Sequence, residues 1–253
     1  MRPETRQSEI VTLLRAMQKE LRVDELASML RVSALTIRRD LEQLAAGGRV
    51  IRTHGGCIAA GRAALETEYH SKVAQNFELK QAVGRAAAEE VRPGSVVLVN
   101  DGSTTFHVAA HLEERAPLTV FTNSIAMITD LGRIPGIELY ILGGRYNREL
   151  YSLQGSLTEH ILEGQQFDVC FIGADSVTPE GQCMVVTPEE ASLTRAMLRR
   201  ARRRVLLADH TKCAEGGYHA YGTLKDFNLW ITTAGVPAEL LQAYRTMVQI
   251  KEA

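Results

Sequence analysis

Residues 22–58 read RVDELASMLRVSALTIRRDLEQLAAGGRVIRTHGGCI, and this stretch decides how the N-terminal part of the chain folds. Its pattern predicts two short helices, Val23 to Leu30 and Ala34 to about Ala46, joined by Arg31-Val32-Ser33. Ser33 suits the start of the second helix because its hydroxyl can accept from the free N–H groups of the first turn. Two helices joined by so short a connection form a helix-turn-helix.

The second helix has an apolar side and a polar side. Ile37, Leu41 and Leu44 stand at i, i+4 and i+7, so they point inward together. The opposite side and its flanks carry Leu35, Thr36, Arg38, Arg39 and Gln43. Arginine can grip phosphates or read guanine, glutamine can read adenine, and leucine can meet a thymine methyl group. The pattern therefore predicts a helix that enters the major groove of DNA.

Residues 49–58 follow Gly47-Gly48 and predict a two-stranded hairpin with Gly55-Gly56 in its turn. Such a wing would place Arg52 and His54 at the DNA backbone or in the minor groove. The residues expected to contact DNA are Ser33, Leu35, Thr36, Arg38, Arg39, Gln43, Arg52 and His54. The plain alternative is an amphipathic helix pair with a solvated basic face. DNA binding is favoured because five features agree: the helix cap, the short turn, the apolar stripe, the row of basic residues and the hairpin.

Length and composition indicate a globular chain with a small basic module. The chain has 253 residues, 45% of them hydrophobic and 23% charged, and a formal net charge of −1. That length suits one large domain or two smaller ones. Residues 31–58 hold five arginines against two acidic residues, a local charge of +3. A local basic surface on a near-neutral chain is typical of a DNA-reading module attached to a larger domain of another kind.

Nothing in the sequence indicates a membrane span, a signal peptide or a metal site. No apolar run reaches the roughly 18 residues that a span requires, and the N-terminus MRPETRQSEI is polar. His107 and His111 have metal-ligand spacing but no HExxH pattern or cysteine partner, so a surface or interface pair is expected. The widely spaced cysteines are expected to be reduced thiols in a cytoplasmic protein without metal or cofactor. They are Cys57, Cys170, Cys183 and Cys213.

The remaining pattern predicts two domains, at 1–58 and 77–253, with a linker at 59–76 that turns helical. A first helix, Thr5 to Gln18, completes the DNA module with Ile10, Leu13, Leu14 and Met17 on one side. Further helices are predicted at 78–91, 104–113, 124–131, 156–162, 188–203 and 238–244, and strands at 95–99, 118–121, 137–142, 169–172, 205–207, 229–232 and 247–250. This alternation predicts an α/β domain, a mostly parallel sheet with helices on both faces.

Polar loops follow five of the predicted strands, and ligands of parallel sheets bind at these carboxyl ends. Glycine lets the backbone approach a ligand, and a helix N-terminus suits phosphate. Each loop alone is an ordinary turn or cap, but together they describe a pocket for a polar, phosphorylated small molecule. They are Asn100-Asp101-Gly102-Ser103-Thr104-Thr105, Thr122-Asn123-Ser124, Gly143-Gly144-Arg145, Gly173-Ala174-Asp175 and Asp209-His210-Thr211-Lys212.

Three further features leave alternatives open. Glu190, near the start of a predicted helix, faces the ligand or only favours the helix N-terminus for dipole reasons. His210 donates to the ligand or makes a structural hydrogen bond. The arginines of 199–204 are expected to end the long helix, where the dipole favours cations, in preference to forming a second nucleic-acid site.

The first domain resembles the DeoR/GlpR family of bacterial transcription regulators. The matching residues are Val23-Asp24-Glu25-Leu26-Ala27, Val32-Ser33, Thr36-Ile37-Arg38-Arg39-Asp40-Leu41 and His54-Gly55-Gly56. Cys57 stands where a small residue such as alanine is more usual. The second domain resembles the sensor domain of the same family in Gly102-Ser103-Thr104, Thr122-Asn123-Ser124, Gly143-Gly144, Gly173-Ala174-Asp175 and Asp209-His210-Thr211-Lys212.

The resemblance implies a sensor fold related to ribose-5-phosphate isomerase and glucosamine-6-phosphate deaminase. It implies that Gly102 to Thr105 holds the effector phosphate and that Asn123, Asp175 and Lys212 contact the sugar or phosphate. Asn100 departs from the usual aspartate, and an amide cannot act as a general base. The expected effector-binding residues are Asn100, Asp101, Gly102, Ser103, Thr104, Thr105, Asn123, Gly143, Gly144, Asp175, Glu190 and Lys212.

The sequence therefore favours a ligand-controlled transcription regulator without enzymatic activity. Its expected partners are double-stranded operator DNA, a phosphorylated sugar or sugar-acid effector, and further copies of itself in a dimer or tetramer. Repression of a carbohydrate catabolic operon is what the resemblance implies. The alternative is a sugar-phosphate isomerase or deaminase with an appended helix-turn-helix, against which Asn100 and the DNA module argue.

Overall fold

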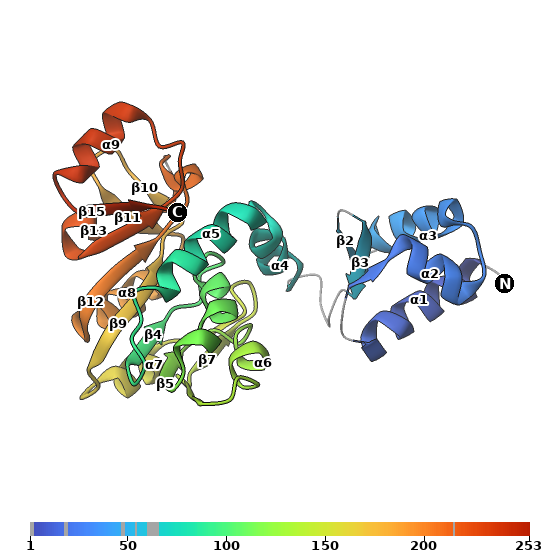
Figure 1. The fold of residues 1–253 in the computed structure, drawn as a ribbon, viewed down its shortest axis with the longest axis horizontal. Coiled ribbons are helices and arrows are strands. Elements are labelled where there is room, and N and C mark those ends of the chain that lie inside the picture. Colours follow the sequence, from blue (N-terminus) through green and yellow to red (C-terminus); the bar gives the residue numbers. More distant parts are fainter. Residues whose placement is uncertain (1–2, 18–19, 47–48, 54, 60–65, 215) are drawn as a thin grey trace. The chain divides into compact units, whose positions relative to one another are not determined.

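The computed structural model describes residues 3–17, 20–46, 49–53, 55–59, 66–214 and 216–253. The chain divides into two compact units, Met1–Ser71 and Lys72–Ala253. Helix α4 (Glu66–Ala74) crosses the boundary between them. Figure 1 shows the elements of each unit. Among the described helices, none combines the length and apolar character that crossing a bilayer requires.

The smaller unit confirms the predicted helix-turn-helix. Its core is formed by Ile10, Leu14, Leu26, Ile37 and Leu41, each at most 1% exposed. The side chain of Met17 lies outside the described residues. The elements are α1 (Pro3–Met17), β1 (Leu21–Arg22), α2 (Val23–Leu30), α3 (Ala34–Ala46), β2 (Val50–Arg52) and β3 (Gly56–Ala59).

The wing has three strands where the sequence indicated two. The short strand β1 pairs antiparallel with β3, and β3 pairs antiparallel with β2. A Cβ on Gly56 would collide with the backbone carbonyl of Leu21, so glycine is what lets these two strands approach. Cys57 lies opposite Leu21 and is fully buried in the core of this unit.

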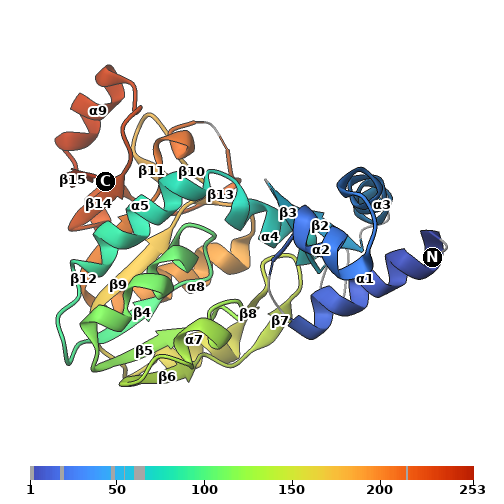
Figure 2. The ribbon, with the colours of Figure 1, turned by 45° about the vertical axis from the view of Figure 1, so that its right-hand side comes forward.

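The larger unit is built on a seven-stranded sheet in the order β15-β14-β12-β9-β4-β5-β6. Every neighbouring pair in it is parallel, so the predicted parallel sheet is confirmed. Figure 2 shows the strands side by side. They are β4 (Val96–Val99), β5 (Leu118–Thr122), β6 (Ile137–Ile141), β9 (Phe167–Gly173), β12 (Ala201–Leu207), β14 (Leu229–Thr232) and β15 (Gln249–Glu252).

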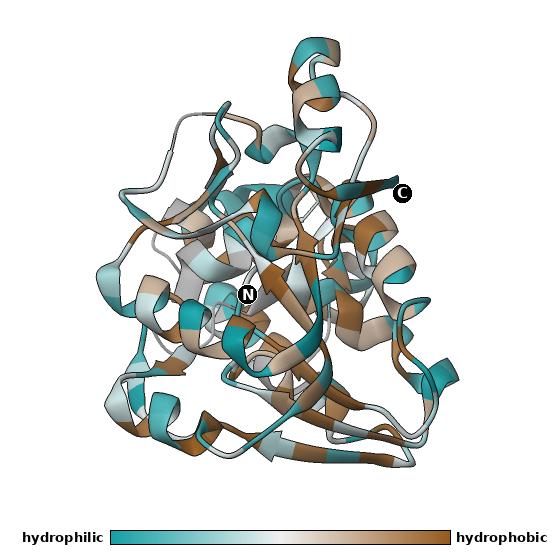
Figure 3. Cartoon of the chain, turned by 90° about the vertical axis from the view of Figure 1, so that its left-hand side faces the viewer, coloured by the Kyte–Doolittle hydropathy of each residue, from teal (hydrophilic) through white to brown (hydrophobic). Residues whose placement is uncertain are grey.

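Helices cover both faces of this sheet. Val97 and Val99 of β4 point into one core with α5 and the 3-10 helix η1, whereas Leu98 points into the other with α7, α8 and α9. Figure 3 shows apolar residues concentrated along the strands. The helices are α5 (Phe77–Ala88), η1 (Thr105–His111), η2 (Glu113–Arg115), α6 (Ile128–Leu131), α7 (Ser156–Leu162), α8 (Pro188–Arg199), η3 (His210–Lys212), η4 (Leu224–Asp226) and α9 (Ala238–Arg245).

The expected arginine-rich end of the long helix was right for Arg199 and Arg200 but wrong for the arginines at 202–204. Helix α8 ends at Arg199, and β12 begins at Ala201. Arg203 therefore lies on a strand and pairs with Glu90 at 2.7 Å. Arg202 of the same strand pairs with Asp168 at 3.6 Å, so these two strand arginines pair with acidic residues and do not end a helix.

Short helices and antiparallel strands also depart from the expectation. The helix predicted at 104–113 is the 3-10 helices η1 and η2, and only α6 forms within 124–131. A hairpin and a three-stranded side sheet in the order β10-β11-β13 were not expected. These strands are β7 (Arg145–Asn147), β8 (Ser152–Gln154), β10 (Ser176–Val177), β11 (Gln182–Val185) and β13 (His219–Thr223).

Candidate DNA-binding surface and ligand site

The outer face of α3 is open to solvent. Leu35 is 59% exposed, and Arg38 and Arg39 are exposed beside it. The hydroxyl of Ser33 accepts from the N–H of Thr36 at 3.1 Å and so caps the helix. The predicted polar face is therefore available to a partner along the start of the helix.

Gln43 lies toward α1, because its side-chain oxygen accepts from the amide of Gln7 at 2.6 Å. Beside it, Asp40 is 3% exposed and accepts from Arg6 Nε at 2.5 Å and from Nη2 at 3.1 Å. This two-pronged bond joins α1 to α3. It gives Asp40 a structural role within the TIRRDL segment that the sequence did not reveal.

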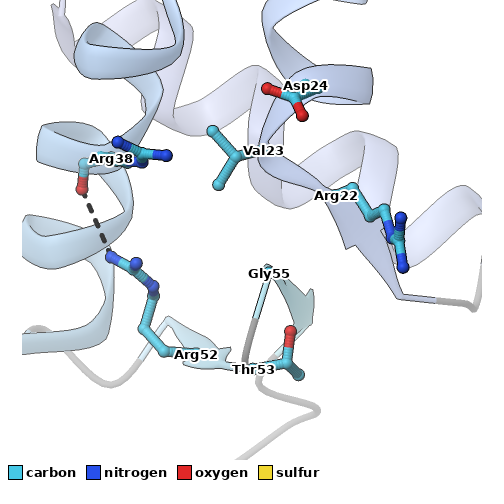
Figure 4. A pocket seen from close by; sticks show the side chains of 7 residues that line it. All are labelled: Arg22, Val23, Asp24, Arg38, Arg52, Thr53 and Gly55. Carbon is cyan, nitrogen blue, oxygen red and sulfur yellow. Dashed lines mark hydrogen bonds between the residues drawn. The ribbon is translucent and has the colours of Figure 1, made fainter.

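A pocket of about 340 Å³, lined by three arginines, lies between α2, α3 and the wing. Arg22, Arg38 and Arg52 line it, as Figure 4 shows. Arg52 donates to the backbone carbonyl of Arg38 at 3.4 Å, which ties the wing to α3. His54, the other predicted wing contact, lies outside the described residues. Arg52 of the wing therefore lies beside the basic face of α3.

In the larger unit, the loop after β4 is tied to the neighbouring strand β9. The side-chain oxygen of Asn100 accepts from the N–H of Gly173 at 3.2 Å and from the hydroxyl of Thr105 at 2.9 Å. Thr104 and Thr105 are buried. A Cβ on Gly102 would lie 3.0 Å from the Thr105 hydroxyl, so the loop is tightly packed. Asn100 and Thr105 therefore shape the loop from inside, which leaves Ser103 and the loop backbone toward the site.

A buried lysine that the sequence analysis missed stands beside this loop. Lys80 of α5 is 3% exposed. Its ammonium donates to the Ser103 hydroxyl at 3.1 Å and to the backbone carbonyl of Lys72. Burial, and to a smaller extent repulsion by Lys212, lowers the pKa of Lys80 to about 8. The sequence does contain a feature that indicates this burial: Lys80 interrupts the apolar face of α5, which continues with Val83 and Ala87.

Lys212 comes to the same place from the loop after β12. Asp209 caps η3 by accepting from the N–H of Thr211 at 3.0 Å, and Lys212 ends that turn. Two lysines, a serine hydroxyl and the start of η1 thus meet at the carboxyl end of the sheet. Oriented N–H groups and ammonium groups of this kind suit a phosphate.

The unexpected hairpin β7–β8 closes another side of the site. Asn123 is fully buried. Its side-chain amide donates to the backbone carbonyl of Leu153 at 3.2 Å, and its backbone carbonyl accepts from the N–H of Leu153 at 2.9 Å. Gly144 (φ 154°) leaves no room for a Cβ beside the Thr158 hydroxyl, which donates to Gly143 at 2.7 Å. Gly143 and Gly144 therefore position the hairpin and α7, a role the sequence did not indicate.

Three acidic side chains gather between the loop after β4, the loop after β9 and the start of α8. Burial raises the pKa of Glu190 to about 7, and the nearby Asp101 and Asp175 raise it as well. Burial also raises the pKa of Asp101, which Ser152 and Asn123 partly offset. Glu190 also caps α8, since it accepts from the N–H of Thr187 at 3.0 Å. Glu190 therefore caps the helix and lies near the acidic cluster, and its contact with a ligand stays a prediction.

The histidines serve packing. His107 contacts Gln81 at 3.1 Å and the carbonyl of Val73 at 3.2 Å, and His111 contacts Gln81 at 2.9 Å. Within the described residues, no group of three or more potential metal ligands is found. His210 makes the structural hydrogen bond, with Nδ1 lying 2.8 Å from the Thr233 hydroxyl.

Comparison with known proteins adds family and fold. The DeoR C-terminal sensor domain matches residues 75–234, and the DeoR-like helix-turn-helix domain matches residues 6–62. The chain is 34% identical over 223 residues to the HTH-type transcriptional regulator YgbI of Escherichia coli (strain K12), covering 87% of this chain and 86% of that protein. It is 32% identical over 209 residues to the HTH-type transcriptional repressor GlcR of Bacillus subtilis (strain 168), covering 83% and 80%. A solved structure of ribose 5-phosphate isomerase A from Methanocaldococcus jannaschii aligns with 55% of this chain and 56% of that one, with a TM-score of 0.40 and 20% identity.

Proposed function

Because the chain belongs to the DeoR family of transcription regulators, we propose that it is a repressor that binds operator DNA and releases it when a phosphorylated sugar occupies the larger unit. The repressor relative from Bacillus subtilis supports this sign of regulation. We infer an operator upstream of a carbohydrate catabolic operon and action in the cytoplasm. A symmetric dimer or tetramer would present paired modules to repeated or palindromic half-sites.

The exposed face of α3 is the observation that carries the DNA half of this proposal. Leu35 is 59% exposed and stands with two exposed arginines on one helix, and the major groove offers a thymine methyl group and guanine edges to these side chains. We propose that Leu35, Arg38 and Arg39 read bases, with Ser33, Thr36 and Gln43 flanking them. Arg52 and His54 would grip the backbone from the wing.

The test uses duplexes that the full chain itself selects from a random library. Fluorescence anisotropy should show that Arg39→Ala weakens binding by about 10-fold or more, the value of one good arginine contact. Arg133→Ala, an exposed arginine of the larger unit, is the matched control and should bind as the wild type does. Equal affinity of Arg39→Ala and wild type would show that this face does not read DNA.

The ligand half rests on the meeting of Lys80, Lys212 and Ser103. The pKa of Lys80 is lowered mainly by burial and further by repulsion from Lys212, so an anion bound beside both ammonium groups would be favourable. We propose that a phosphate group binds here. Gly102, Thr104 and Thr105 would contribute through the loop backbone, and Asn100 would hold that loop in shape.

We further propose that Lys80 couples the ligand to the DNA module. Its ammonium bonds both Ser103 in the phosphate loop and the carbonyl of Lys72 in α4, the helix that crosses the boundary between the units. A phosphate would compete with the Lys72 carbonyl for this ammonium. Binding then favours an arrangement in which the end of α4 is released, and a ligand shifts a population only through such a difference in affinity.

One observation favours the enzymatic alternative. Glu190 has a pKa of about 7 and lies close to Asp101, which is what a general base in a sugar-phosphate isomerase would need. Turnover assays with pentose and amino-sugar phosphates decide between the two functions. Robust turnover by the wild type that is abolished in Glu190→Gln would show that the protein is an enzyme as well as a regulator.

A further inference from the structure

The ligand site has two ends of opposite charge. At one end, the ammonium of Lys80 donates to Ser103, and Lys212 lies close enough to repel it. At the other, the carboxyl groups of Asp101 and Glu190 lie close enough to act on one another's charge, and Asp175 acts on both. Asp101 and Ser103 belong to the same loop after β4, so one small ligand that lies along this loop meets both ends.

Buried polar atoms without partners surround the acidic end. Asn123, Ser124 and Ser152 are fully buried, and Gln154 is 1% exposed. Among the described residues, Asn123 Oδ1, Ser124 Oγ and Gln154 Nε2 make no hydrogen bond, whereas Asp101 is hydrogen-bonded to Ser152 and Asn123. Buried polar groups are normally paired, so a concentration of unpaired ones at the carboxyl ends of neighbouring strands points to a ligand that pairs them.

The hydrogen-bonding capacity of these atoms indicates which groups the ligand carries. Asn123 Oδ1 is an acceptor, Gln154 Nε2 is a donor, and the two serine hydroxyls can act either way. A ligand hydroxyl, which both donates and accepts, can pair with each of these atoms. A ligand carboxylate only accepts, so it would leave Asn123 Oδ1 unpaired, and it would add a like charge beside Asp101 and Glu190.

We propose that this end of the site selects the hydroxyl-rich end of a phosphorylated sugar or sugar alcohol and rejects the carboxylate of a phosphorylated sugar acid. The proposal rests on the proposed function and narrows it, because the phosphate end would accept either class. Asp101 and Glu190 are the residues that discriminate, and Asn123 and Ser152 complete the hydrogen bonding of the accepted ligand.

The test compares ligands that differ only at the carbon farthest from the phosphate. The pairs are ribitol 5-phosphate with 5-phosphoribonate, sorbitol 6-phosphate with 6-phosphogluconate, and erythritol 4-phosphate with 4-phosphoerythronate. Each pair has the same length and phosphate, and exchanges CH2OH for a carboxylate. Calorimetric titration of the full chain at pH 7.5 should give, in the best-bound pair, a Kd for the alcohol at least about 10-fold lower than for the acid.

Variants separate recognition from a structural role. In Asp101→Asn and in Glu190→Gln, which keep the size of the side chain, the acid should gain affinity and the ratio within the pair should shrink. A purely structural residue would weaken both members equally, which would overturn the assignment. Phosphate alone, titrated as inorganic phosphate, should bind wild type and both variants alike.

The two proposals fail in different ways. If the acid of the best-bound pair binds as tightly as the alcohol or more tightly, the polarity inference is overturned while the phosphate site stands. If neither the six compounds nor inorganic phosphate bind, the phosphate site of the proposed function is overturned, and this inference is overturned with it.

Discussion

The ammonium of Lys80 lies 3.1 Å from the hydroxyl of Ser103 and also donates to the carbonyl of Lys72. One buried cation thus connects the loop after β4 with the end of α4. Burial lowers the pKa of Lys80 to about 8, below the ordinary 10.5 of lysine. An anion bound beside Lys80 would therefore stabilise its charged form.

Replacing Lys80 by methionine should weaken phosphate binding. The variant keeps the length of the side chain but loses a charge-assisted hydrogen bond, which is worth about 2 kcal/mol or roughly 30-fold in affinity. Calorimetric titration with inorganic phosphate measures the loss. Lys225→Met, at an exposed lysine of η4, is the control and should bind phosphate as the wild type does. Unchanged phosphate affinity in Lys80→Met would place the anion elsewhere.

Glu190 should make the larger unit less stable as the pH rises. Because its pKa is raised from 4.5 to about 7, the folded chain binds this proton more tightly than the unfolded chain does. Stability from this group is therefore lost between these two pH values as the pH increases. At pH 8, the free energy of unfolding of Glu190→Gln should exceed that of the wild type by an amount on the order of 2 kcal/mol. This difference in stability should become smaller toward pH 5.5.

Thermal unfolding of both proteins across this pH range measures that gap. Glu189→Gln, at the exposed neighbouring position, should show no pH-dependent gap from wild type. A gap of constant size for Glu190→Gln would mean that the substitution acts on the cap of α8 and not on a buried charge.

Asp40 should be essential to the packing of α1 on α3. Asp40→Ala removes the carboxylate that binds the nearly buried Arg6 in two places, and breaking such a pair costs about 3 kcal/mol or more. Amide hydrogen exchange should then accelerate in α1 and α3 but not in β4 and β9. Glu42→Ala, at an exposed position of α3, should leave exchange unchanged. Unchanged protection of α3 in Asp40→Ala would refute this role.

Leu35 and Arg52 should affect DNA binding differently. Arg52→Ala removes a wing cation and should weaken all duplexes alike, lowering the slope of log affinity against log salt by about 1. Leu35→Ala should instead relax the preference for a T·A pair at one position of the site. Selection from a random library, followed by salt titration, compares the two. A sequence-specific loss in Arg52→Ala would assign the wing to base reading.

The helix-turn-helix was predictable because its signals are local. Caps, a short turn and an apolar stripe determine α2 and α3, and both helices begin and end where the sequence predicted. The buried strands of the parallel sheet were also found, since each is a short apolar run. The strand β12 was found only in part, because arginine favours helices and the pairing of Ala201 with Phe167 is set by distant residues.

The ligand site was predictable in its loops but not in its chemistry. The sequence placed Asp101, Asn123 and Asp175 at strand ends, where they lie. It could not show that Ser152 would join them, because β7 and β8 are three residues long each and owe their pairing to tertiary packing. It likewise treated Lys80 as an ordinary helix residue, since burial of a lysine depends on what packs over it.

The most direct test of the account measures operator affinity with and without ligand. The full chain is titrated onto its selected operator by fluorescence anisotropy, alone and with a saturating amount of the sugar or sugar-alcohol phosphate that binds it best. The account predicts that the ligand raises the operator Kd at least about 10-fold in wild type, and that Lys80→Met loses this response even at ligand concentrations that saturate it. An operator Kd that is the same with and without bound ligand would contradict the account.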